Sequence, residues 1–199
     1  MSELVWRLKR RLFETFRNSG PFKTILEKEN QNLVYLLNQI SLADKRVLDL
    51  GVGTGNVLNF LKDAHKVIGI DFSESMLLST KKHFPEANLV RANVVQLPIR
   101  SDCLDVITAV GLVEYLKDII PLVEEVSRSL RHKGYFLLTF SPPNIWTRLR
   151  LFLGHPLYPR NLDQIASVAR FNQFELCYHT QSMMQVQVLF VKKENGIKS

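Results

Sequence analysis

From Lys45 onward, short β-branched runs alternate with longer helical patterns, and this alternation limits the fold more than any other feature. The strand-like runs cover residues 46–50, 66–71, 88–91, 104–110 and 134–140. Helical patterns cover residues 54–64 and 119–130. A further helical segment opens at Ser73, which is a candidate N-cap. Strands that alternate with helices form βαβ units with right-handed crossovers, so the sequence predicts an α/β fold with a parallel sheet.

The C-terminal part departs from this alternation. Runs 174–178 and 185–191 are strand-like, and only a short connection separates them. Parallel neighbours need a crossover of about a dozen residues, so this pair predicts an antiparallel hairpin, preceded by a helix over 162–170. No internal repeat or low-complexity linker interrupts the chain, so we expect a single domain over 1–199.

Two further segments lie outside the alternation. Residues 2–40 predict one or two helices, broken at Ser19-Gly20-Pro21. Residues 141–160 form an insertion after the fifth strand. Because the carboxyl ends of parallel strands carry the ligand crevice, an insertion there is expected to act as a lid.

Composition excludes several classes of protein. With 199 residues, 46% hydrophobic and 23% charged, the chain is long enough for one globular core. Cys103 and Cys177 lie far apart without CxxC spacing, which argues against disulfides and thiolate metal sites and favours the cytoplasm. No apolar run reaches a membrane-span length, and basic residues interrupt the N-terminus where a signal peptide needs an apolar stretch.

The net charge of +7 is concentrated near the N-terminus. The first 23 residues contain six basic and two acidic residues, which supply +4 of that charge. A basic excess attracts nucleic acid, anionic lipid or acidic substrates without choosing among them. Nucleic acid is the less favoured partner, because the basic residues are not interleaved with aromatic ones along a stacking platform.

The turn after the first strand, Asp49-Leu50-Gly51-Val52-Gly53-Thr54-Gly55-Asn56, is the strongest functional signal. A dinucleotide fingerprint requires glycine where Asn56 stands, and the phosphate-binding GxxxxGK[ST] pattern is absent. Asp49 would oppose an anion at the turn and favour a cation. Asp71 ends the second strand, where an acid can bind ribose hydroxyls. The alternatives are a tight turn that binds nothing and an Asp71 that only caps the helix at Ser73.

Residues 45–140 resemble the class I S-adenosylmethionine-dependent methyltransferases, in particular a small-molecule subgroup similar to ubiquinone/menaquinone C-methyltransferases. The resemblance rests on five motifs in order, which begin at Asp49, Gly69, Arg91, Cys103 and Arg128. It implies a Rossmann-like, doubly wound sheet of seven strands, mostly parallel with the last strand antiparallel. It also implies that N-terminal helices over 1–40 and a lid over 141–160 cap the substrate site.

The resemblance also implies roles for individual residues. Asp49 would lie near the ammonium group of the cofactor, the backbone of Gly51 and Gly53 against its methionine part, and Asp71 at its ribose. Phe72 and Met76 would pack against the adenine, and Asn93 stands where the family has Asp. The complete cofactor-binding set that we expect is Asp49, Gly51, Val52, Gly53, Gly55, Asp71, Phe72, Met76, Asn93, Val94 and Val110, with no metal.

Glu114 and Tyr115 follow the fourth strand, where relatives place polar groups that face the acceptor. They are candidates for a general base or an acceptor contact; the alternative is that Glu114 is a solvated acid at a helix start. The resemblance implies methyl transfer to a small acceptor. Other readings are a non-catalytic protein that binds S-adenosylmethionine as a partner, and a nicotinamide oxidoreductase, which Asn56 disfavours.

Two segments combine apolar and basic residues in the manner of interfacial helices. The first carries Val5, Leu8, Leu12 and Phe16 at helical spacing, and the second carries Ile145-Trp146 and 149–153. They lead to the hypothesis of a lipophilic or membrane-associated acceptor and peripheral contact with an anionic membrane. The alternative is that these apolar faces pack onto the domain and onto each other.

Overall fold

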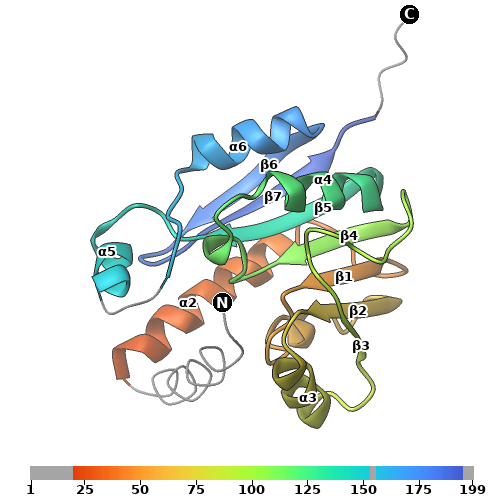
Figure 1. The fold of residues 1–199 in the computed structure, drawn as a ribbon, viewed down its shortest axis with the longest axis horizontal. Coiled ribbons are helices and arrows are strands. Elements are labelled where there is room, and N and C mark those ends of the chain that lie inside the picture. Colours follow the sequence, from red (N-terminus) through yellow and green to blue (C-terminus); the bar gives the residue numbers. More distant parts are fainter. Residues whose placement is uncertain (1–19, 153–155, 195–199) are drawn as a thin grey trace, which may run out of the picture.

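A computed structural model of the chain describes residues 20–152 and 156–194. Seven strands form one sheet with helices on both faces (Figure 1). The helices are α2 (Gly20–Leu37), α3 (Glu74–His83), α4 (Ile120–Ser129), α5 (Ile145–Phe152) and α6 (Leu162–Phe171), with short 3-10 helices η1 (Val57–Phe60) and η2 (Val113–Tyr115). The strands are β1 (Arg46–Leu50), β2 (Lys66–Asp71), β3 (Asn88–Arg91), β4 (Leu104–Ala109), β5 (Leu130–Phe140), β6 (Phe174–Gln181) and β7 (Val186–Lys192).

The sheet has the strand order β3-β2-β1-β4-β5-β7-β6. The pairs β1–β2, β2–β3, β1–β4 and β4–β5 are parallel, whereas β7 is antiparallel to both β5 and β6. The predicted mostly parallel sheet, with seven strands and an antiparallel last strand, is therefore confirmed. The order reverses between β1 and β4, and in open α/β sheets ligands bind at such a reversal, beyond the carboxyl ends of the strands.

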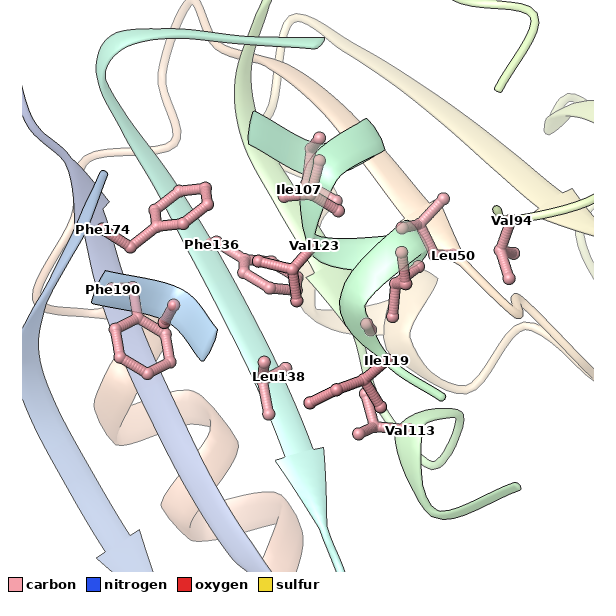
Figure 2. Packing of buried hydrophobic residues seen from close by; sticks show 14 of the residues in the cluster. Leu50, Val94, Ile107, Val113, Ile119, Val123, Phe136, Leu138, Phe174 and Phe190 are labelled. Carbon is pink, nitrogen blue, oxygen red and sulfur yellow. The ribbon is translucent and has the colours of Figure 1, made fainter. Parts of the chain in front are cut away.

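Helices cover both faces of the sheet, which is why every residue of β1 except Arg46 and every residue of β4 except Asp105 is buried. On one face, α4 and α6 pack on a cluster that includes Ile107, Val123, Phe136 and Phe174 (Figure 2). On the other face, Leu33, Leu36 and Leu37 of α2, with Ile40 just after it, pack against Val47, Val106 and Leu137. The described part of the N-terminal segment thus contributes to the core; residues 1–19 lie outside the described residues.

The predicted helix over 54–64 is wrong: only the short 3-10 helix η1 forms there. Gly55 has a φ of +85°, which right-handed helix does not allow, and Leu58 N–H bonds to Gly55 O three residues back. Val57, Leu58 and Leu61 are nevertheless buried. Successive tight turns bury the same residues as a helix would, so the apolar spacing did not distinguish the two.

Other boundaries differ modestly from those predicted. β5 begins at Leu130 instead of residue 134, because Leu130 pairs with Leu104 before the register shifts. β6 continues to Gln181 because β7 pairs with it along that length. Within the described residues, no helix combines the length and the apolar character needed to cross a bilayer.

Candidate active site

The glycine-rich turn after β1 is closely packed at Gly55 and open at Gly53. Gly51, Gly53 and Gly55 all have positive φ values, between 55° and 85°. A Cβ on Gly55 would lie 2.8 Å from the Phe84 ring and 2.9 Å from the Thr80 methyl carbon. Among the described residues, a Cβ on Gly53 would have only the Gly51 carbonyl oxygen, at 3.7 Å, within 4 Å. Gly55 is therefore required for packing, whereas the backbone of Gly53 is open to a ligand.

Asp71 connects the end of β2 to this turn. Its Oδ2 accepts a hydrogen bond from Gly53 N–H at 2.9 Å, and its Oδ1 accepts one from Ser73 N–H at 2.8 Å. The helix cap itself is the Ser73 hydroxyl, which accepts from Met76 N–H. Burial raises the pKa of Asp71, although the hydrogen bonds from Ser73 and Gly53 oppose this. Asp71 is therefore not the cap of α3; its carboxylate instead links the end of β2 to the glycine-rich turn.

Asp49 places a buried carboxylate beneath the same turn. The residue is 1% exposed, and its Oδ1 accepts a hydrogen bond from the Thr108 hydroxyl at 2.6 Å. Its Oδ2 is buried and has no hydrogen-bond partner among the described residues. Burial raises the pKa of Asp49 to about 7, and the nearby charge of Asp71 adds to this. Such an oxygen is stabilised by a cation or a hydrogen-bond donor.

The other residues that we expect to bind the cofactor differ in how far their side chains are exposed to solvent. Phe72 is 67% exposed, with the Arg91 guanidinium 5.9 Å from its ring centroid. Met76 is buried on α3. Asn93 Oδ1 already accepts a hydrogen bond from Val95 N–H at 3.2 Å, so an adenine amino group would use its second lone pair. The side chains of Val52 and Val94 are buried, and that of Val110 packs on the α2 side of the sheet.

Glu114 lies inside the protein, so the alternative of a solvated acid is wrong. It is 3% exposed, and its Oε2 is buried without a hydrogen-bond partner among the described residues. Burial raises the pKa of Glu114; Arg150 and Arg160 oppose this and Glu29 adds to it. Burial also raises the pKa of Tyr115 to about 12, so that hydroxyl keeps its proton at neutral pH.

The 141–160 insertion is attached to η2. Arg160 donates hydrogen bonds to the carbonyl oxygens of Val113, Leu116 and Lys117. Tyr158 N–H donates to Glu114 O at 2.7 Å. These bonds hold the C-terminal end of the insertion against the segment that contains Glu114. Figure 1 shows α5, which belongs to the same insertion, beyond the end of β5.

Sequence reasoning missed Glu29, Arg150 and Arg160 at this site. Glu29 accepts a hydrogen bond from the Ser182 hydroxyl, and Arg150 donates one to the Ser141 hydroxyl. Each residue comes from a segment distant in sequence from Glu114. No spacing pattern marks such residues in advance, since only the packing of α2 and of the 141–160 insertion brings them together.

The sheet order, the glycine turn after β1 and the acid at the end of β2 together define a Rossmann-like methyltransferase fold. Residues 48–138, a little under half of the chain, match the family model described as a methyltransferase domain.

Known proteins that resemble the chain agree with this assignment. A probable S-adenosylmethionine-dependent methyltransferase from Mycolicibacterium smegmatis is 30% identical over 136 residues, which are 65% of this chain and 52% of the relative. Demethylmenaquinone methyltransferase from Chlamydia felis is 31% identical over 120 residues, which are 57% of this chain and 51% of the relative. The chain thus spans about half the length of these curated relatives.

Solved structures with little sequence identity to this chain have a similar fold. Magnesium protoporphyrin IX methyltransferase (ChlM) from Synechocystis PCC 6803, solved with bound SAM, superimposes with a TM-score of 0.72. The match covers 97% of this chain and 98% of that chain at 14% identity. At this identity the likeness concerns the fold alone.

The residues at the turn fit S-adenosylmethionine. Its ammonium and sulfonium groups are cationic, and Asp49 Oδ2 is a buried carboxyl oxygen without a partner among the described residues, whose ionised form a nearby cation would favour. The open side of Gly53 leaves room for close approach of a ligand to the backbone. An anionic pyrophosphate would instead meet the carboxylates of Asp49 and Asp71.

Proposed function

We propose that this protein transfers a methyl group from S-adenosylmethionine to a small-molecule acceptor. The observation that carries the proposal is the buried carboxylate of Asp49, whose second oxygen lacks a partner among the described residues, directly below the glycine turn. A site that bound nothing would leave this oxygen without compensation for its loss of water. A cationic cofactor supplies that compensation.

The chain's own residues would hold and orient the cofactor. Asp71, which is already tied to Gly53 and Ser73, has free lone pairs for two ribose hydroxyls. Asp49 would face the ammonium group, Gly51 and Gly53 the methionine part, and Phe72, Met76 and Asn93 the adenine. When bound, S-adenosylmethionine supplies a methyl group already activated on a sulfonium. The protein then contributes mainly position and exclusion of water, which can lower a barrier by about 7–11 kcal/mol.

Two measurements test this function. Isothermal titration calorimetry with S-adenosylhomocysteine tests the cofactor site, and labelled S-adenosylmethionine with a cell extract tests transfer. We expect binding and a labelled small-molecule product. Failure to bind S-adenosylhomocysteine contradicts the proposal, and NAD(H) binding in its place would favour an oxidoreductase. Tight binding without any labelled product would favour a non-catalytic partner protein.

We further propose that the acceptor is lipophilic and that the protein works in the cytoplasm at an anionic membrane surface. Support comes from α5, where Ile145, Leu149 and Phe152 follow one another at helical spacing and are 70%, 47% and 86% exposed. Trp146 beside them is 40% exposed, and Arg148 on the same helix is exposed. The chain's net charge of +7 adds attraction to anionic lipid.

A further inference from the structure

A second group of buried and partly buried polar side chains lies where α2, η2, α5 and the β6–β7 hairpin meet. Glu29 Oε1 on α2 accepts a hydrogen bond from the Ser182 hydroxyl at 3.1 Å, and Glu29 O accepts one from Gln187 Nε2 at 2.9 Å. Asn144, at the start of α5, donates to Met183 O at 2.8 Å. These bonds bring α2, the start of α5 and the β6–β7 hairpin to one place, and the bond from Tyr158 N–H to Glu114 O joins η2 to the segment that follows α5.

Several buried polar atoms in these segments lack a hydrogen-bond partner among the described residues. They are Glu114 Oε2, Gln187 Oε1, Thr147 Oγ1, Thr180 Oγ1 and Asn32 Nδ2. Glu114, Gln187 and Thr147 are each at most 3% exposed. A buried polar group without a partner costs about 1–3 kcal/mol, so a cluster of such groups indicates a ligand. Glu114 Oε2 and Gln187 Oε1 only accept hydrogen bonds, the two threonine hydroxyls can also accept, and Asn32 Nδ2 alone is restricted to donating.

The charged groups at this place come from three segments. Glu114 feels a like charge from Glu29 on α2 and opposite charges from Arg150 on α5 and Arg160 beyond it. Glu29 in turn feels the charge of Arg150. Tyr115, next to Glu114, interacts with the Arg150 guanidinium through its hydroxyl. Two carboxyl groups therefore share one arginine, while Arg160 donates hydrogen bonds to the carbonyl oxygens of Val113 in η2 and of Leu116 and Lys117 just after it.

We propose that Glu29 and Glu114, together with Arg150, form the acceptor-binding site, and that the acceptor is an uncharged small molecule bearing a hydroxyl group whose proton passes to Glu114. This inference rests on the proposed function and gives its substrate class. Glu29 and Glu114 repel an anionic acceptor, whereas the positive charges of Arg150 and Arg160 together offset the attraction of the two carboxyl groups for a cationic one. A neutral hydroxyl donates to the unpartnered oxygens without either conflict.

The proton balance of the reaction agrees with this assignment. The hydroxyl oxygen forms a bond to the methyl carbon, the carbon–sulfur bond breaks with its electron pair kept by sulfur, and the hydroxyl proton goes to Glu114. Burial raises the pKa of Glu114 and of Glu29, which makes each a better proton acceptor than an exposed glutamate. Glu29 is assigned as a positioning residue, because its hydrogen bonds with Ser182 and Gln187 hold it beside Glu114.

The experiment uses the full chain saturated with S-adenosylhomocysteine and three probes that share one ring: phenol, benzylamine and benzoate. Binding is measured by titration for the wild type, Glu29→Gln, Glu114→Gln and the control Glu27→Gln. Glu27 lies on the same helix as Glu29 and is exposed, with a side chain 57% accessible and 4.0 Å from Lys23. We expect phenol to bind tightest, and to bind about tenfold more weakly to each of the two site variants but not to the control.

S-adenosylhomocysteine affinity, measured first in every variant, separates the two proposals. Affinity within about twofold of the wild type shows that a variant folds with its cofactor site intact. The acceptor assignment is overturned if the cofactor analogue binds but phenol does not, if benzylamine or benzoate binds tighter than phenol, or if both site variants match the control. Failure of the wild type to bind S-adenosylhomocysteine overturns the proposed function as well.

Discussion

The carboxylate of Asp71 accepts a hydrogen bond from the backbone N–H of Gly53 at 2.9 Å. This bond links the end of β2 to the glycine-rich turn after β1, so the acid that would hold the ribose also shapes the loop that would hold the methionine part. Order in the turn and affinity for the cofactor are therefore coupled through one side chain.

Replacing Asp71 tests this coupling. Asp71→Ala removes an anionic acceptor, so we expect S-adenosylhomocysteine to bind about 1–3 kcal/mol more weakly, a factor of about 5 to 150. Titration calorimetry measures the change. The matched control is Asp63→Ala, since Asp63 is exposed in the turn before β2. An unchanged dissociation constant for Asp71→Ala would show that the site lies elsewhere.

The two glycines of the turn are expected to respond differently to alanine. Gly55→Ala places a methyl group against Phe84 and Thr80 at a φ of +85°, and should lower the free energy of unfolding by about 2–4 kcal/mol. Gly53→Ala carries only the backbone strain of its φ of +55°, about 1–2 kcal/mol, but its methyl group enters the open side of the turn. Gly53→Ala should therefore weaken S-adenosylhomocysteine binding more than it weakens the fold.

Urea unfolding and titration calorimetry on both variants check this contrast. If Gly53→Ala bound the cofactor analogue as tightly as the wild type, the open side of Gly53 would not be part of the binding site.

Asp49 should make stability depend on pH. Its pKa is raised from 3.8 when exposed to about 7 in the fold, so the native state binds more protons than the unfolded chain between these values. Stability is therefore fully present below about pH 4 and falls as the pH rises to about 7, by about 2–4 kcal/mol from this group. Asp49→Asn, which keeps an oxygen for Thr108, should reduce that fall.

The free energy of unfolding in urea, measured from pH 5 to about pH 8 for both proteins, checks the sign. Identical pH dependence in the wild type and Asp49→Asn would contradict the assigned burial of the charge. S-adenosylhomocysteine should offset part of the fall in the wild type, because its ammonium group stabilises the ionised carboxylate.

Membrane association is expected to depend on α5. Phe152→Ser and Ile145→Ser remove the two most exposed apolar side chains of that helix, and should reduce sedimentation with anionic vesicles at low salt. Phe171→Ser is the control, because Phe171 is 84% exposed at the end of α6. Absence of vesicle binding by the wild type at low salt would eliminate the membrane hypothesis.

Much of the fold was predictable from local patterns. β1, β2 and β3 have the predicted bounds, since their apolar runs end sharply in glycines or polar residues. The helix predicted over 54–64 was wrong because apolar residues three and four apart suit consecutive 3-10 turns as well as an α-helix. The Asp49, Gly53 and Asp71 arrangement followed from residues adjacent to strand ends, whose relative position a parallel sheet imposes.

By itself, the sequence determined the order of strands and helices, the antiparallel C-terminal hairpin and the acid-flanked glycine turn, because each depends on residues close together in the chain. Only the tertiary structure decided that Glu29, Glu114 and Arg150 act on one another, and that Glu114 is buried. Those relationships arise because α2 packs on one face of the sheet while the insertion is held against η2 by Arg160. Contacts between segments that are so far apart in the chain produce no periodic pattern in the sequence.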